Sequence, residues 1–181
     1  TSDHYDSFTL KQFELFKEGV AQIRAAGFEP EYIHCCNSAA IAWYKEAIEF
    51  STHVRSCTSV LGHMSMEDGR EPIGLTEPVE IGTYITNIHH VDTGESVGYS
   101  QAFNAEKPMT VATVSVGFAD GFYPVWMRKQ GPVLVNGHRT RFLGCCMDQS
   151  FIDVTDIDCS IGDRVIMVGR DGDEQITTWE M

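Results

Sequence analysis

One stretch of this chain combines residue types that can hold an anion. Asn37 and Ser38 stand where a short apolar run ends and a helical pattern begins, and both are favoured at helix starts. Exposed backbone N–H groups at a helix start attract anions, and a serine hydroxyl can complete such a site. Arg55 ends the next extended segment and brings a permanent positive charge. The pattern predicts an anion site, although Asn-Ser alone is more typical of a plain helix cap.

Further motifs lie in the later part of the chain. Residues 97–100 read Val-Gly-Tyr-Ser, residues 117–121 read Gly-Phe-Ala-Asp-Gly, and residues 146–149 read Cys-Met-Asp-Gln. A phenol such as that of Tyr99 can exchange a proton with a substrate, but tyrosine ordinarily has a pKa of about 10 and needs a cation nearby to act as a base at neutral pH. Taken alone, Gly-Tyr is more typical of a half-buried aromatic residue, and Met147 of a turn after a strand.

The elements that position the first motif alternate between helical and extended patterns. In order, they are residues 9–26 (helix), 32–36 (extended), 38–50 (helix) and 52–61 (extended). Ser7 or Thr9 is the expected N-cap of the first helix, and Gly27 its stop. This alternation with short turns is typical of a parallel α/β unit, although two strands cannot close a barrel.

The pattern changes after Gly62, and we expect a domain boundary within residues 63–79. From residue 79 onward no helical period is found, and short apolar runs are separated by turn sequences. The expected strands are residues 79–91, 109–116, 133–135, 140–146, 150–154 and 164–168. We therefore expect an α/β domain over residues 1–78 and a small antiparallel β-barrel domain over residues 79–181.

Composition excludes several classes of partner. The chain has 181 residues, of which 43% are hydrophobic, and its 13 basic and 26 acidic residues give a net charge of −13. Such a charge repels phosphate backbones and anionic membrane surfaces, so we expect no nucleic-acid partner and no membrane contact. No run of about 20 apolar residues occurs, and the first residues lack a signal-peptide pattern. We expect a soluble, cytoplasmic protein that extends beyond both ends of this chain.

The six cysteines are expected to be free thiols. Two adjacent pairs, Cys35–Cys36 and Cys145–Cys146, lie in extended runs, where neighbouring side chains should point to opposite faces. Neither pair should then hold one ion easily, and no C-x-x-C motif is present. We expect no metal site, and thiols that are buried or half-buried in a reducing compartment.

Taken together and in this order, the motifs resemble those of the C-terminal part of the alanine racemase family. That likeness runs through nearly the whole chain. It implies the last two β/α units of a (β/α)8 barrel, followed by a small antiparallel β-barrel domain. It also implies a racemase that uses pyridoxal 5'-phosphate to interconvert L- and D-alanine, and so supplies D-alanine for cell-wall peptidoglycan.

The resemblance implies a role for residues in the first domain. His34, Asn37, Ser38 and Arg55 match family segments on the seventh and eighth barrel strands, whereas Cys57 and Thr58 stand where glycine and isoleucine are common. By that likeness Ser38 and the backbone of Cys57 and Thr58 would hold the cofactor phosphate. Arg55, oriented by His34, would face the pyridine nitrogen and keep it unprotonated.

The resemblance also assigns roles in the second domain. Tyr99 matches the catalytic tyrosine, which moves the α-proton on one face of the substrate while a lysine serves the other. The backbone N–H of Met147 would meet the substrate carboxylate, with Asp148 beside it. Phe118 stands where a tyrosine of the substrate channel is common, so one hydroxyl contact would be lost.

One essential part of that mechanism is missing from the chain. None of its five lysines lies in a sequence like the family's Val-Lys-Ala-Asn-Ala-Tyr-Gly, which carries the Schiff-base lysine. We therefore expect a fragment that is inactive alone, from a homodimer whose active sites are shared between subunits. A serine racemase of the vancomycin-resistance type would share these motifs, and a non-catalytic β-domain that binds a ligand or dimerises is a third alternative.

Overall fold

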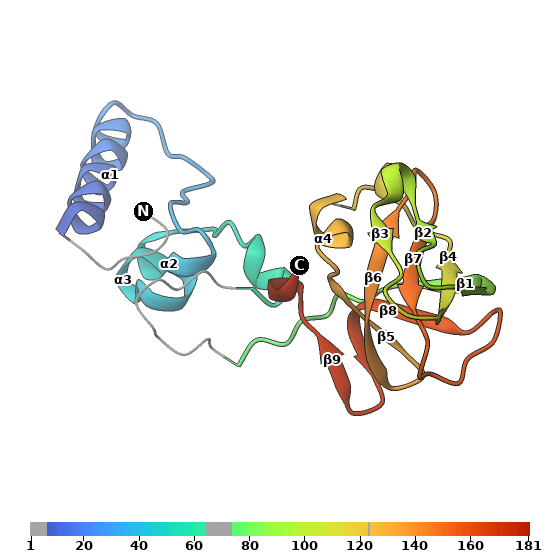
Figure 1. Cartoon of the computed structure of the whole chain (residues 1–181). Coiled ribbons are helices and arrows are strands. Elements are labelled where there is room, and N and C mark those ends of the chain that lie inside the picture. The colour runs from blue at the N-terminus through green and yellow to red at the C-terminus, as the bar shows by residue number, and fades with distance from the viewer. Residues whose placement is uncertain (1–6, 64–73, 123) are drawn as a thin grey trace. The chain divides into compact units, whose positions relative to one another are not determined.

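The structure, a computed structural model, describes residues 7–63, 74–122 and 124–181. The chain divides into two compact units, Thr1–Pro78 and Val79–Met181 (Figure 1). Most of the expected boundary segment, residues 64–73, lies outside the described residues. No helix in the described ranges has the length and apolar character needed to cross a bilayer.

Helix α1 (Ser7–Ala25) opens the first unit and ends as the sequence predicts. Gly27 takes a φ of +87°, in the left-handed region, and the backbone N–H of Phe28 donates to the carbonyl of Ile23 at 3.2 Å. Glycine tolerates this conformation best, so the expected stop is confirmed. Phe13 and Val20 are buried, whereas four large apolar side chains of the helix are exposed: Phe8, Leu10, Leu15 and Ile23.

The second expected helix is in fact two. Helices α2 (Ser38–Trp43) and α3 (Lys45–Phe50) are separated at Tyr44, whose φ of −113° and ψ of 71° are not helical. The single helix expected over residues 38–50 is therefore wrong. The ring of Phe50 on α3 makes edge contacts with Phe13 and Phe16 of α1, with centroids 5.8 and 6.0 Å apart. These contacts form the core of the unit.

The two extended segments of this unit contact one another without forming assigned strands in the described residues. Thr52 N–H donates to the Ile33 carbonyl at 2.8 Å, and Arg55 N–H to the Cys36 carbonyl at 2.9 Å. A strand is stabilised by hydrogen bonds to neighbouring strands, and here each extended segment has few such bonds beyond those to the other segment. The extended pattern expected to residue 61 is wrong at its end, because Thr58–Leu61 form a 3-10 turn, η1.

The second unit is an antiparallel β-barrel, as predicted. Its strands are β1 (Ile81–Val91), β2 (Ser96–Val97), β3 (Phe103–Asn104), β4 (Met109–Val114), β5 (Pro132–Val135), β6 (His138–Cys145), β7 (Ser150–Asp153), β8 (Arg164–Asp171) and β9 (Glu174–Ile176). Neighbours pair in the order β1-β4-β7-β6-β5-β8, and β8 pairs back with β1, which closes the ring. Closure removes the free edges from these six strands.

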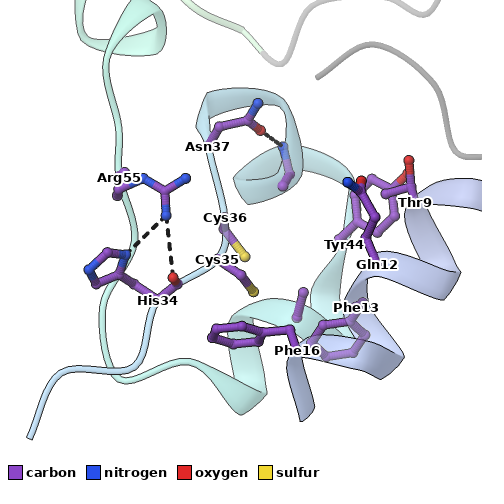
Figure 2. A pocket seen from close by; sticks show the side chains of 12 residues that line it. Thr9, Gln12, Phe13, Phe16, His34, Cys35, Cys36, Asn37, Tyr44 and Arg55 are labelled. Atoms are coloured by element: carbon purple, nitrogen blue, oxygen red, sulfur yellow. Dashed lines mark hydrogen bonds between the residues drawn. The ribbon is translucent and has the colours of Figure 1, made fainter. Parts of the chain in front are cut away.

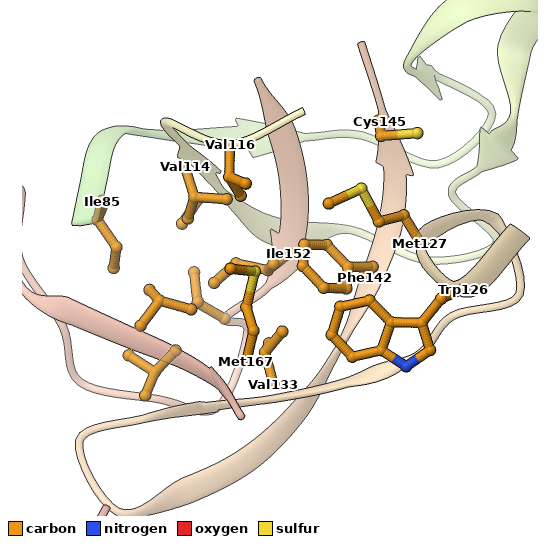
Figure 3. Close-up of a cluster of buried hydrophobic side chains, with 14 residues drawn as sticks. Ile85, Val114, Val116, Trp126, Met127, Val133, Phe142, Cys145, Ile152 and Met167 are labelled. Carbon is orange, nitrogen blue, oxygen red and sulfur yellow. The ribbon is translucent and has the colours of Figure 1, made fainter. Parts of the chain in front are cut away.

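Alternation along the strands separates two layers of apolar side chains. Val133 and Val135 on β5 point into the main core, whereas Leu134 between them packs with Ile166 and Ile176. Phe142 lies at the centre of the main core beside other fully buried side chains (Figure 3). The sequence did not indicate β9, β2, β3 or the short helix α4 (Pro124–Arg128), because each is too short to show a period.

Candidate active site

The start of α2 brings together one hydroxyl and two backbone donors. Asn37 caps the helix, since its side-chain oxygen accepts from the N–H of Ala40 at 2.9 Å. The neighbouring Ser38 is buried, and its Oγ accepts from the N–H of Cys57 at 3.0 Å and of Ser59 at 3.4 Å. The loop after the second extended segment therefore folds onto the start of α2.

The two backbone donors come from Cys57 and Ser59. Thr58, which the sequence resemblance places at the cofactor phosphate, lies between them and opens the η1 turn. The hydroxyls of Ser59 and Ser56 lie 2.7 Å apart, and Gly62 ends the turn at a φ of +77°. Two serines three residues apart, Ser56 and Ser59, followed by Gly62, are typical of a tight turn. This pattern could have predicted that Ser59 lies in the turn.

Arg55 lies directly against His34 (Figure 2). Its Nη1 is 3.0 Å from His34 Nδ1 and donates to the His34 carbonyl at 3.3 Å. A guanidinium has only donors, so Nδ1 must accept and a neutral His34 carries its proton on Nε2. Both residues line a cavity of about 560 Å³, together with Asn37 and the two cysteines that precede it. His34 therefore fixes the direction of the Arg55 side chain.

In the β-barrel unit, Tyr99 sits on a strained turn between β2 and β3. Its side chain is 58% exposed, and the turn η2 (Tyr99–Gln101) follows Gly98 at a φ of +81°. Ser100 and Gln101 both take a positive φ, 56° and 54°, although neither is glycine. Such conformations cost free energy and often occur where a side chain must be held in one direction.

The two other motifs of this unit dock on one another through their backbones. Phe118 N–H donates to the Cys146 carbonyl at 3.1 Å, and Ala119 N–H to the Met147 carbonyl at 2.9 Å. A Cβ on Gly117 would lie 2.3 Å from the Met147 carbonyl oxygen, so this approach requires glycine. Residues 117–121 and 146–149 therefore form one continuous surface.

Cys146 connects that surface to the tyrosine turn. Its thiol accepts a hydrogen bond from the backbone N–H of Tyr99, and burial raises the pKa of the thiol above its ordinary value. Tyr99 and Met147 are both more than half exposed, Asp148 is exposed, and Phe118 is half-buried against the main core. Three motifs that are far apart in the sequence thus meet at Cys146. Its motif was singled out in the sequence, but nothing in the residue type indicated this contact.

Comparison with known proteins identifies the family. The model of the alanine racemase N-terminal domain matches residues 1–64, and that of the C-terminal domain matches residues 79–181. The alanine racemase of Symbiobacterium thermophilum is 31% identical over 176 residues, 96% of this chain and 46% of that protein.

Solved structures agree with the sequence match. The alanine racemase of Bacillus anthracis with bound L-Ala-P superposes with a TM-score of 0.86 at 29% identity, over 99% of this chain and 46% of that one. The alanine racemase of Bartonella henselae with covalently bound pyridoxal phosphate has a TM-score of 0.75 at 28% identity, over 93% and 45%. The chain spans somewhat less than half the length of these relatives. It belongs to the alanine racemase family.

Proposed function

We propose that this chain provides the C-terminal part of an alanine racemase, which interconverts L- and D-alanine as the complete polypeptide. The observation that carries the proposal is the meeting of the motifs of Tyr99, Phe118 and Met147 at Cys146, in a chain that belongs to this family. The named relatives are alanine racemases, which favours alanine over serine as the substrate.

The residues at the start of α2 fit a pyridoxal phosphate group. The N–H groups of Cys57 and Ser59 both point at the Ser38 oxygen in this structure, and a hydroxyl with two backbone N–H groups beside it can bind a phosphate monoester. When bound, the cofactor withdraws electrons from the substrate and makes its α-proton acidic. Arg55 would face the ring nitrogen and hold it unprotonated, with His34 fixing the guanidinium in place.

The β-barrel unit would supply the groups that handle the substrate. Tyr99 would take or return the α-proton on one face, as a phenolate stabilised by cations of the complete active site. The strained turn and the Cys146 thiol would hold its backbone in place. The N–H of Met147 would bind the substrate carboxylate, with Phe118 and Asp148 bordering the substrate.

The Schiff-base lysine would come from a part of the protein outside residues 1–181. A lysine that forms a Schiff base needs a lowered pKa, which favours its neutral amine. Lys17 shows the opposite, because hydrogen bonds to Glu14 and then Glu46 raise the pKa of its amine. Lys45 forms an exposed ion pair with Glu49 at 3.5 Å.

The assembly and location follow from the same proposal. The active protein would be a cytoplasmic homodimer, with the tyrosine of one subunit completing the site of the other. Its product, D-alanine, would serve cell-wall peptidoglycan. A serine racemase and a non-catalytic β-domain are the alternatives that the assay must separate from this function.

The proposal is tested by racemisation assays on the complete polypeptide and on the 181-residue chain. With pyridoxal phosphate, the complete polypeptide should convert L-alanine to D-alanine faster than L-serine to D-serine. The isolated chain should do neither above the rate of the free cofactor. Faster conversion of serine would favour the serine racemase, and no conversion by the complete polypeptide would favour a binding module.

The cofactor site has a matched pair of variants. Ser38→Ala removes the hydroxyl to which two N–H groups point, whereas Ser59→Ala leaves its backbone N–H in place. In the complete polypeptide, Ser38→Ala should weaken retention of pyridoxal phosphate, measured by absorbance after dialysis, more than Ser59→Ala does. Equal retention by both variants would contradict the assigned phosphate site.

A further inference from the structure

The adjacent thiols of Cys35 and Cys36 do not point to opposite faces. The thiol of Cys36 contacts that of Cys35 and also the Ser51 hydroxyl, and Cys35 Sγ lies 3.6 Å from Ser51 Oγ. Figure 2 shows both sulfur atoms on the same side of the segment, facing the cavity. The expectation from strand alternation was wrong here, because residues 32–36 lack the strand pairing that would enforce it.

A single hydroxyl holds the two sulfurs together. Ser51 Oγ donates its own proton to the Ala47 carbonyl at 2.7 Å, so its oxygen is left to accept from thiols. Both thiols have that hydroxyl as a neighbour, which places them next to one another. The second adjacent pair differs: Cys145 is part of the main core, whereas Cys146 bonds the backbone of Tyr99.

The cavity beside the sulfurs has an aromatic wall. It measures about 560 Å³, and the rings of Phe13 and Phe16 line it together with both cysteines. Cys35 is half-buried and Cys36 has no exposed surface. A ligand would therefore reach Cys35 first and then close onto Cys36, with any aromatic group packed against the phenylalanines.

From this geometry we infer that Cys35 and Cys36 form a dithiol site for trivalent arylarsenic compounds. A trivalent arsenic atom is pyramidal and holds two sulfurs side by side, as this pair presents them. In the binding step, two S–H bonds and the arsenic–oxygen bond of an arylarsenoxide break. Two As–S bonds form, and the oxygen leaves with both protons as water, with no change of oxidation state.

The chemistry of the thiols suits this condensation better than alkylation. Burial first, and the neighbouring Cys35 second, raise the pKa of the Cys36 thiol to about 11. Alkylating reagents need the thiolate, which is scarce for this residue at neutral pH. The condensation with an arsenoxide consumes two neutral thiols and needs no net deprotonation. Resistance of Cys36 to iodoacetamide, together with capture of arsenic, would be characteristic of the site.

The test is titration of the folded 181-residue chain with phenylarsine oxide, followed by intact mass spectrometry. One arsenical should bind per chain, with the loss of one water, and it should resist a monothiol but be released by 2,3-dimercaptopropanol. The adduct should map to the tryptic peptide of residues 25–45 rather than to residues 142–164, which hold the other adjacent pair.

Two variants separate the adjacent pairs. Cys35→Ser should lose the dithiol-reversible adduct, and Cys146→Ser should keep it. Unfolding the wild-type chain in guanidinium should add a second site, because only the fold separates Cys145 from Cys146. The inference is overturned if folded wild type binds no arsenical, if the adduct maps to residues 142–164, or if Cys35→Ser binds as wild type does. Peptide mapping of the wild type decides the matter even if Cys35→Ser does not fold.

Discussion

The two units of this chain differ in how much of their structure they complete by themselves. In the β-barrel unit, six strands close into a ring around a core whose central residues have almost no exposed surface. In the N-terminal unit, two extended segments share a few backbone hydrogen bonds, and several large apolar residues of α1 remain exposed. The β-barrel unit closes on itself, whereas the N-terminal unit resembles the end of a larger structure.

This difference explains how the site residues are held. Tyr99, Phe118 and Met147 lie on loops fixed by the closed barrel and by Cys146, so their geometry needs nothing further from this chain. Ser38 and Arg55 lie on a unit in which, among the residues that the structure describes, several large apolar side chains of α1 remain exposed. We expect substitutions in the barrel to act locally and sharply, and those in the N-terminal unit to act on a structure that is already easily opened.

The largest stability effect should come from the barrel core. Phe142 is fully buried, and its ring packs edge-on against that of Trp126 with the ring centroids 5.0 Å apart. Phe142→Ala should therefore lower the free energy of unfolding by about 3 to 5 kcal/mol. Phe13→Ala, the matched change in the N-terminal unit, should cost less, because the surrounding unit can collapse into the space. Urea denaturation measures both. Equal losses would contradict the difference between the units.

The contact between the two barrel loops should be the next most sensitive. In Gly117→Ala the new Cβ would clash with the backbone at Met147, so we expect a loss of about 1 to 3 kcal/mol. Gly19→Ala is the control: nothing lies within 4 Å of its added Cβ, and alanine should stabilise α1 by about 0.5 to 1 kcal/mol. In thermal melts, Gly117→Ala should unfold at a lower temperature than wild type and Gly19→Ala at a higher one.

Replacing the Cys146 thiol should have a smaller effect on stability. Cys146→Val keeps the approximate size but removes the acceptor for the Tyr99 N–H, at a cost of about 1 kcal/mol. Cys146→Ser retains an acceptor, so it should keep the Tyr99 turn better ordered. Amide hydrogen exchange at Tyr99 reports this directly: exchange should accelerate in the valine variant, and equal rates in both variants would refute the contact.

The smallest effect concerns acid stability at the end of the barrel unit. Hydrogen bonds from the backbone at Thr177, and then from Arg139, lower the pKa of Glu180 despite some desolvation. Because the folded-state pKa is lowered, the stabilisation is present above the ordinary pKa of 4.5 and is lost as the pH falls through the lowered value. The side chain is 35% exposed, so the effect should stay below about 1 kcal/mol.

A substitution isolates this contribution. Glu180→Gln should unfold at a lower urea concentration than wild type near neutral pH, and the difference should shrink as the pH falls below 4.5. A difference between the two proteins that does not depend on pH would mean that the carboxylate has no such role.

The sequence predicted the barrel better than the N-terminal unit, for physical reasons. A short apolar run such as that of β5, whose valines and leucine are all buried, indicates a core strand whatever surrounds it. The break at Tyr44 and the absence of assigned strands within the described part of residues 32–57 depend on neighbouring segments, which no local pattern encodes.

Within the candidate site, side chains were easier to predict than backbone contacts. The motifs indicated Ser38, Arg55 and Tyr99 by residue type and order. Ser59 acts through its backbone N–H, which almost any residue can supply, so its type carried no signal. Cys146 acts through its thiol as a hydrogen-bond acceptor, which its type alone did not indicate. The side-by-side thiols of Cys35 and Cys36 were missed for a related reason, since alternation holds only where a strand is paired.

We propose that Tyr99 moves the α-proton on one face of an alanine substrate. The most direct measurement is racemisation, with α-proton exchange from L- and D-alanine in deuterated water, by Tyr99→Phe in the complete polypeptide. Tyr84→Phe is the matched control, because Tyr84 is similarly exposed on the same unit. Tyr99→Phe should lower turnover by about 10² to 10⁴ and lose exchange with one enantiomer, while cofactor absorbance is unchanged. Near-normal racemisation by Tyr99→Phe, or an equal loss in Tyr84→Phe, would contradict the claim.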